Sequence, residues 1–133
     1  MLNKDKETSI GIVYDSKRYD ITIQVTIRKT ETMKNNIINE IANQLPLSDK
    51  PITRILKKGT DSKTIILGLK GGVILKEHKT NTPTTLLIIK GNVVYKEKDR
   101  QIKLVTFECI DIPVDVIHAV EATNDSICLL IQG

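Results

Sequence analysis

The only two histidines of this 133-residue chain are its best candidates for chemistry. His78 ends a short apolar stretch and precedes a polar loop that contains Pro83, and His118 follows Pro113 in a second apolar stretch. A neutral imidazole can accept a hydrogen bond, bind a transition metal or move a proton near neutral pH. Two imidazoles do not specify a reaction, so a ligand pocket and a metal site both remain open.

The residues around each histidine predict strands that would position these side chains. Successive residues of a strand point to opposite faces, so Ile74, Lys76, His78 and Thr80 should share one face. The same alternation groups Thr84 with Leu86 and Ile88, and Val116 with His118 and Val120. We therefore expect a cavity with an aliphatic floor, which is typical of small-ligand sites. Its polar rim would consist of Lys76, His78, Thr80, Thr84 and His118.

From Pro51 onward the hydrophobic pattern has a period of two, interrupted by turns such as Lys70-Gly-Gly72. Many short strands with regular turns and no helix between them favour a closed barrel or a sandwich. The expected strands are 52–57, 64–69, 73–78, 85–90, 92–96, 102–106, 108–112, 117–122 and 126–132. The fold class is therefore mainly β.

The first 50 residues predict a β-hairpin, with strands at 9–14 and 19–29, and the only convincing helix, at 31–45. Met33, Ile37, Ile41 and Leu45 recur four residues apart, which places them on one helix face. Thr30 or Thr32 could cap the start of the helix, and Pro46 should end it. We treat 1–133 as a single domain, with 1–50 as a hairpin and helix extension and 51–133 as the barrel.

Residues 72–91 resemble the first conserved motif of the cupin superfamily. Gly72, His78 and Gly91 stand at matching positions, whereas Thr80 replaces the second motif histidine and Thr84 the motif glutamate.

Residues 107–122 resemble the second cupin motif. Pro113 and His118 match, while Phe107, Asp115 and Ala122 replace two glycines and an asparagine. The resemblance covers about residues 52–133 and implies a jelly-roll barrel, also called a double-stranded β-helix.

The resemblance also implies a metal held by three histidines and a glutamate. This chain keeps only His78 and His118 of those four ligands, and a bound transition metal usually needs three or four. A divalent transition metal is therefore left open as a cofactor. We expect a small-molecule-binding cupin that is non-catalytic or weakly catalytic. The alternatives are a metal-dependent oxygenase or isomerase using both histidines, and a protein-interaction module acting through the N-terminal extension.

Composition limits the other classes of function. The net charge is +4, but the basic residues are spread along the chain and form no stripe, and aromatic residues make up only 3%. Both features argue against nucleic-acid binding. The longest apolar run, 86–89, is too short to span a bilayer, and residues 1–7 lack the apolar core of a signal peptide. We therefore expect a cytoplasmic protein in which Cys109 and Cys128 are buried free thiols.

The consecutive apolar residues Leu86, Leu87, Ile88 and Ile89 need cover on both faces of their strand. The hairpin and the helix carry further apolar faces, more than the outer wall of one small barrel can cover. We therefore predict a homodimer in which the 19–29 strand extends or covers a sheet of a second copy.

Overall fold

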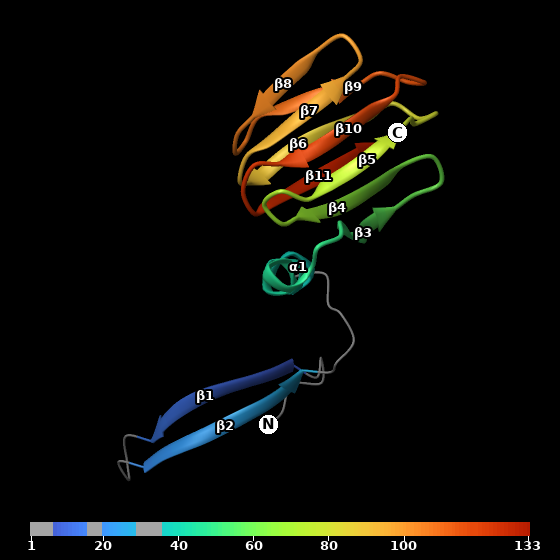
Figure 1. Cartoon of the computed structure of the whole chain (residues 1–133). Helices are drawn as coiled ribbons and strands as arrows, with labels where there is room; N and C mark the ends of the chain where they lie inside the picture. The colour runs from blue at the N-terminus through green and yellow to red at the C-terminus, as the bar shows by residue number, and fades with distance from the viewer. Residues whose placement is uncertain (1–6, 16–19, 29–35) are drawn as a thin grey trace. The chain divides into compact units, whose positions relative to one another are not determined.

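The computed structural model describes residues 7–15, 20–28 and 36–133 of the chain (Figure 1). The chain divides into two compact units, residues 1–33 and 34–133. The predicted helix had been grouped with the hairpin, but it belongs to the larger unit. That residues 1–133 form a single domain stays a prediction.

The smaller unit is an antiparallel hairpin of β1 (Glu7–Asp15) and β2 (Asp20–Arg28). Its strands pair from Glu7 opposite Arg28 to Asp15 opposite Asp20. Both strands lie where the alternating pattern predicted them, within two residues at each described end. The connecting residues 16–19 are outside the described part.

The larger unit contains two antiparallel sheets. The first has the strand order β5-β10-β7-β8, and the second has the order β3-β4-β11-β6-β9. The strands of the first sheet are β5 (Ile74–His78), β10 (His118–Ala122), β7 (Val93–Glu97) and β8 (Gln101–Leu104). Those of the second are β3 (Ile52–Lys58), β4 (Lys63–Leu69), β11 (Ser126–Gln132), β6 (Thr84–Lys90) and β9 (Cys109–Ile112).

The main core lies between the two sheets. Every second residue of β6, namely Thr84, Leu86 and Ile88, is buried, as the sequence alternation predicted. Leu86 and Ile88 meet Tyr95 of the four-stranded sheet and Cys128 of β11 in one apolar cluster. The mainly β prediction is confirmed. The barrel is not closed, however, because no strand of one sheet pairs with a strand of the other.

One helix packs on the outer face of the five-stranded sheet. It is α1 (Ile37–Gln44), followed by the 3-10 turn η2 (Leu45–Leu47) that contains Pro46. Ile37, Ile41 and Leu45 are buried, which confirms the predicted apolar stripe. They pack with residues of β3, β4 and β11 in a second cluster, which includes Ile52, Ile66 and Ile127.

The helix was predicted to start at residue 31, but the described helix starts at Ile37. Residues 29–35, which include Met33 and the two expected caps, lie outside the described part. The helix was predicted to end at Leu45, before Pro46, and the α-helix ends one residue earlier, at Gln44, with Pro46 in the 3-10 turn that follows. Among the described helices, none has the length and apolarity needed to cross a membrane.

The two cysteines have different surroundings. Cys128 is fully buried in the core, as predicted, and this burial raises the pKa of its thiol to about 12. Cys109 is exposed on the edge strand β9, so the prediction that both thiols are buried is wrong for Cys109. The side-chain parity of a four-residue edge strand is not evident from its sequence.

Candidate functional site

Three strands of the four-stranded sheet place a carboxylate and two imidazoles in one row. β10 lies between β5 and β7, and His118 pairs with His78 on one side and with Glu97 on the other. Residues directly opposite each other in antiparallel strands project from the same face of the sheet. The row Glu97–His118–His78 therefore shares one face, although its members are far apart in sequence.

The two imidazoles are in contact. Their ring centroids are 4.3 Å apart and the ring planes are inclined by 57°. Because the histidines lie on neighbouring strands of one sheet, the rings lie side by side. The two histidines of the expected rim are thus neighbours on one sheet.

Backbone carbonyls fix the tautomer of both rings. Nδ1 of His78 is 2.7 Å from the carbonyl oxygen of Lys76, and Nδ1 of His118 is 2.9 Å from that of Val116. A carbonyl oxygen can only accept, so Nδ1 carries the proton in each ring. In the neutral histidines both Nε2 atoms consequently carry a free lone pair. No described residue is hydrogen-bonded to either Nε2.

The two rings differ in exposure. His118 is only 3% exposed, whereas His78 on the edge strand is exposed. Burial lowers the pKa of His118 below its usual 6.5 and outweighs the opposing effects of the Val116 carbonyl and the Glu97 carboxylate. The fold therefore favours a neutral His118 that can accept a hydrogen bond.

A hydrogen-bonded cluster supports His118 from the β7 side. The Tyr95 ring stacks near His118, with centroids 5.8 Å apart, and its hydroxyl donates to Glu97 Oε2. Arg100 donates to both oxygens of the same carboxylate, over 2.7 and 2.9 Å. The bonds from Arg100 and Tyr95 lower the pKa of Glu97 to about 2, and burial raises the pKa of Tyr95.

Sequence reasoning missed Tyr95 and Glu97 as part of the site. The available signal was the alternation along β7, which puts Val93, Tyr95 and Glu97 on one face. What the sequence could not supply was the pairing of β7 with β10.

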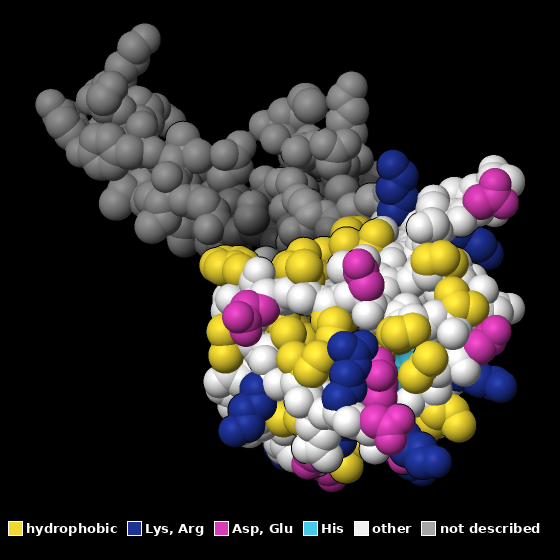
Figure 2. Space-filling model, turned by 90° about the horizontal axis from the view of Figure 1, so that it is seen from above, with side chains coloured by type: hydrophobic (Ala, Val, Ile, Leu, Met, Phe, Trp, Pro, Cys, Tyr) yellow, Lys and Arg dark blue, Asp and Glu magenta, His cyan; other side chains and the backbone are white. Residues whose placement is uncertain are grey.

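Two recesses open beside the histidine pair. A recess of about 470 Å³ is lined by His118, Val116, Ile117 and charged residues, and one of about 560 Å³ is lined by His78, Lys76 and mainly apolar residues. Glu77 borders both of them. Figure 2 shows a small area of histidine surface between acidic and hydrophobic side chains.

The remaining predicted rim residues do not all join the histidines. Lys76 lines the recess of His78, but Thr84 borders a separate recess of about 320 Å³ near Asp111. The Thr80 hydroxyl is bonded within its own loop, to the backbone of Thr82. That these five residues bind a ligand stays a prediction.

The residues of β5 that face the core also differ from those predicted. Leu75 packs on the core and Ile74 is 44% exposed, although Ile74 had been grouped with His78. The cause is a β-bulge: His78 pairs with His118, but Leu75, three residues earlier, pairs with Val120, only two residues later. Such a bulge reverses the alternation along the strand.

The site does not fit a tightly held metal ion. The two Nε2 atoms are suitable donors, and their Nδ1–H bonds to carbonyls resemble those of metal-binding histidines. The third ligand is missing, because the nearby Glu97 is already engaged by Arg100 and Tyr95. Among the described residues no three His, Cys, Asp or Glu side chains are grouped so that they could hold a metal.

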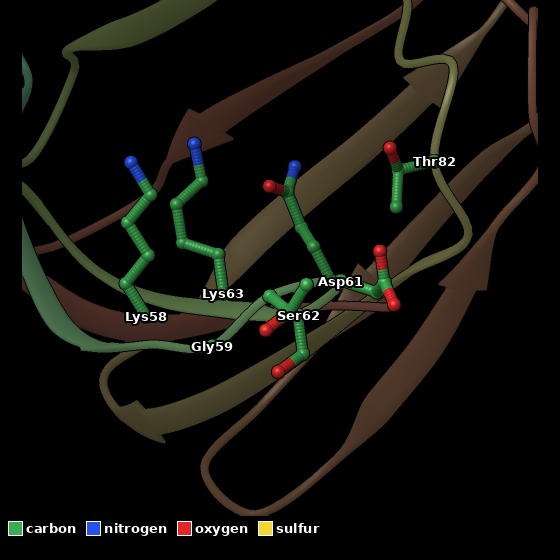
Figure 3. Close-up of a pocket in the computed structure, with 8 residues that line it drawn as sticks. Lys58, Gly59, Asp61, Ser62, Lys63 and Thr82 are labelled. Carbon is green, nitrogen blue, oxygen red and sulfur yellow. The ribbon is translucent and has the colours of Figure 1, made fainter.

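A further recess lies away from the histidines. It has a volume of about 340 Å³ and is bordered by the turn between β3 and β4, by Thr82 and by Gln132. Figure 3 shows Lys58 and Lys63, which are opposite each other in the strand register, extending side by side to the left of Ser62 and Asp61. This recess contains neither histidine.

Solved structures share this arrangement of strands at low sequence identity. No family model matches the chain, and no curated protein sequence matches it. A cupin superfamily protein from Desulfitobacterium hafniense is 22% identical and superposes with a TM-score of 0.59, over 62% of this chain and 75% of that chain.

Two other solved structures extend the likeness. A conserved protein with a double-stranded β-helix domain from Klebsiella pneumoniae has 14% identity and a TM-score of 0.62, over 70% of this chain and 85% of its own. A protein of unknown function from Streptococcus pyogenes has 16% identity and a TM-score of 0.61, over 80% and 89%. At these identities the likeness shows the fold alone.

Proposed function

We propose that this chain, which has the fold of the cupin superfamily, binds a small molecule at the His78–His118 pair and has little or no catalytic activity of its own. The observation that carries the proposal is the pair of free Nε2 lone pairs, held side by side by two backbone carbonyls. Neither Nε2 atom stabilises the fold through a hydrogen bond to a described residue.

The surroundings support a ligand of modest size. The recess at His118 has about 470 Å³, within the range of small-molecule sites, and Val116 and Ile117 give it an apolar wall. Hydrogen bonds from Tyr95 and Arg100 hold the Glu97 carboxylate in place at this recess, so a ligand would meet a group that is already oriented. The localisation proposed with this function is cytoplasmic, and the proposed assembly is a homodimer.

The experiment is a ligand screen read at the histidines. Protein labelled with ¹⁵N is mixed at pH 8 with a panel of small polar molecules, and the imidazole nitrogens are followed by long-range ¹H–¹⁵N spectra. We expect at least one compound to shift both Nε2 signals, and His118→Gln and His78→Gln to weaken its binding. Lys58→Gln, in the separate recess of Figure 3, is the matched control and should bind normally.

If compounds bind but leave both imidazoles unchanged, or if both histidine variants bind normally, the proposed site is wrong. The melting temperature of each variant is measured in parallel, because His118 is buried and its replacement can also destabilise the fold.

A metal-dependent enzyme is the second candidate, favoured only by the two Nε2 atoms and their carbonyl-bonded Nδ1 atoms. Elemental analysis of untagged protein separates the two. We expect less than about 0.1 equivalent of any transition metal after dialysis, since two ligands hold such ions weakly. One equivalent of iron, zinc, nickel or manganese that disappears in His118→Gln would favour the enzyme.

A further inference from the structure

The recess at His118 is lined by an excess of acidic side chains. Four acidic residues line it, namely Glu77, Glu97, Asp99 and Asp115. Only two basic residues border it, Lys96 and Lys98.

Two of these six charges are already neutralised. Glu97 is held by Arg100, and Lys96 forms an ion pair with Glu121. Among the described residues no ion pair involves Glu77, Asp99, Asp115 or Lys98. Within the described part of the chain, Glu77, Asp99 and Asp115 therefore line the recess without an ion pair, against Lys98 alone among its basic lining residues. This excess of acidic residues favours a positively charged ligand.

An independent feature of the same recess is the buried imidazole of His118. The side chain is 97% removed from solvent, lines the recess and has no described partner at Nε2. A buried acceptor without a partner costs free energy, typically about 1–3 kcal/mol. A ligand that donates a hydrogen bond to Nε2 would recover this cost, whereas an anionic acceptor would be repelled.

Asp115, which lines the recess, has an unusual backbone conformation. Its φ of 61° lies in the left-handed region, which an aspartate tolerates better than most residues. Its N–H donates to the carbonyl of Thr80 over 2.8 Å, which joins the turn before β10 to the loop after β5. Asparagine tolerates the same backbone conformation, so Asp115→Asn removes the charge with little change in shape.

We propose that the ligand of this recess is a small organic cation, an alkylammonium compound whose N–H group donates to His118 Nε2 and whose charge is balanced by Glu77, Asp99 and Asp115. Val116 and Ile117 would contact a short alkyl chain on the ammonium group. The inference rests on the proposed function and adds the ligand's chemical class. A carboxylate or phosphate of the same size would meet acceptors and negative charge only.

The test compares three probes with the same four-carbon chain: n-butylammonium chloride, sodium butyrate and n-butanol. Each is titrated at pH 8 and constant ionic strength into ¹⁵N-labelled protein, and the His118 Nε2 signal is followed. We expect a saturable shift with butylammonium, a weaker one with butanol and none with butyrate. Because surface charge pairs contribute little each, Asp115→Asn should weaken butylammonium binding about three-fold to five-fold.

Asp61→Asn is the matched control. Asp61 borders the separate recess of Figure 3, so its replacement should leave the affinity for butylammonium unchanged. Butyrate binding as well as butylammonium, or unchanged affinity in Asp115→Asn, would overturn the inference. If butanol or butyrate moves the imidazole signals while butylammonium does not, the ligand class is wrong and the His78–His118 site remains. If other compounds also fail to move them, both proposals are lost.

Discussion

His118 couples the stability of the fold to pH through a single buried ring. Burial lowers its pKa below 6.5, so the unfolded chain takes up a proton at a higher pH than the folded chain. The folded state therefore loses stability as the pH falls below about 6.5, and the loss levels off below the folded pKa. Above 6.5 this residue adds no pH dependence.

We predict that the free energy of unfolding falls measurably between pH 7 and pH 5, and that His118→Gln removes most of this slope. Urea denaturation at intervals of half a pH unit measures both effects. A slope that persists in full in His118→Gln would show that another group is responsible.

The Glu97 carboxylate accepts hydrogen bonds from Tyr95 and Arg100. Glu97→Ala leaves the hydroxyl of buried Tyr95 without its acceptor and frees Arg100, so we expect a loss of about 1–3 kcal/mol in the free energy of unfolding at pH 7. Tyr95→Phe, which removes the hydroxyl together with its need for a partner, should cost less. Equal losses in the two variants, measured by urea denaturation, would contradict this account.

The contribution of Glu97 also has a pH signature. Its folded pKa of about 2 lies below the usual 4.5, so its stabilisation is complete above pH 4.5 and is lost as the pH falls toward 2. This range is separate from that of His118.

At the level of residues, the sequence analysis selected His78 and His118 but not the residues that lie beside them. The motif positions of His78 and His118 indicated that their strands come together, and the structure pairs them. Glu97 was missed because a strand pairs with a neighbour whose identity depends on the fold of the whole sheet. No local pattern links residue 97 to residue 118.

At the level of elements, α1 and β4 meet where the sheet has no side chain. A Cβ placed on Gly68 would lie 2.5 Å from Ile41 Cγ2 and 3.1 Å from Leu45 Cδ2. The helix can approach the sheet closely only because residue 68 is glycine.

We predict that Gly68→Ala and Ile41→Ala are non-additive. Gly68→Ala should destabilise by about 1–3 kcal/mol through overpacking, and Ile41→Ala by about 2–5 kcal/mol through a cavity. In the double variant the new methyl group occupies part of that cavity, so its loss should be at least about 1 kcal/mol smaller than the sum. Simple additivity in urea denaturation would indicate that the helix shifts to accommodate each change.

The elements themselves were largely predictable from the sequence. Period-two alternation located the strands of both sheets within one or two residues, because successive side chains of a strand point to opposite faces. The bulge between β5 and β10 was not predictable, since it depends on pairing that only the folded sheet defines. It moved Ile74 to the exposed face and altered the expected site.

At the level of the whole molecule, part of the apolar surface is covered within the chain. Ile89 on the outer face of β6 packs against the cluster that α1 forms with the sheet. The hairpin lies in the other unit, and its register pairs Ile23 with Ile12 and Val25 with Ile10.

We predict a homodimer in which the 19–29 strand covers or extends a sheet of a second copy, because a two-stranded hairpin alone is marginally stable. Light scattering at micromolar concentration should give a mass well above the 14.9 kDa of one chain. Deletion of residues 1–30 should return the mass to that of a single chain. A wild-type mass near 14.9 kDa that persists on concentration would refute the dimer.

The difference in exposure between the two cysteines allows transient opening of the core to be measured by alkylation. Cys109 lies open at a sheet edge, while Cys128 is sealed between the sheets with its thiol pKa near 12. An alkylating reagent should therefore modify Cys109 rapidly, and should modify Cys128 only when the two sheets separate transiently. The second, slow addition of mass would time the opening of the core, and a compound seated beside His118 should lengthen that time.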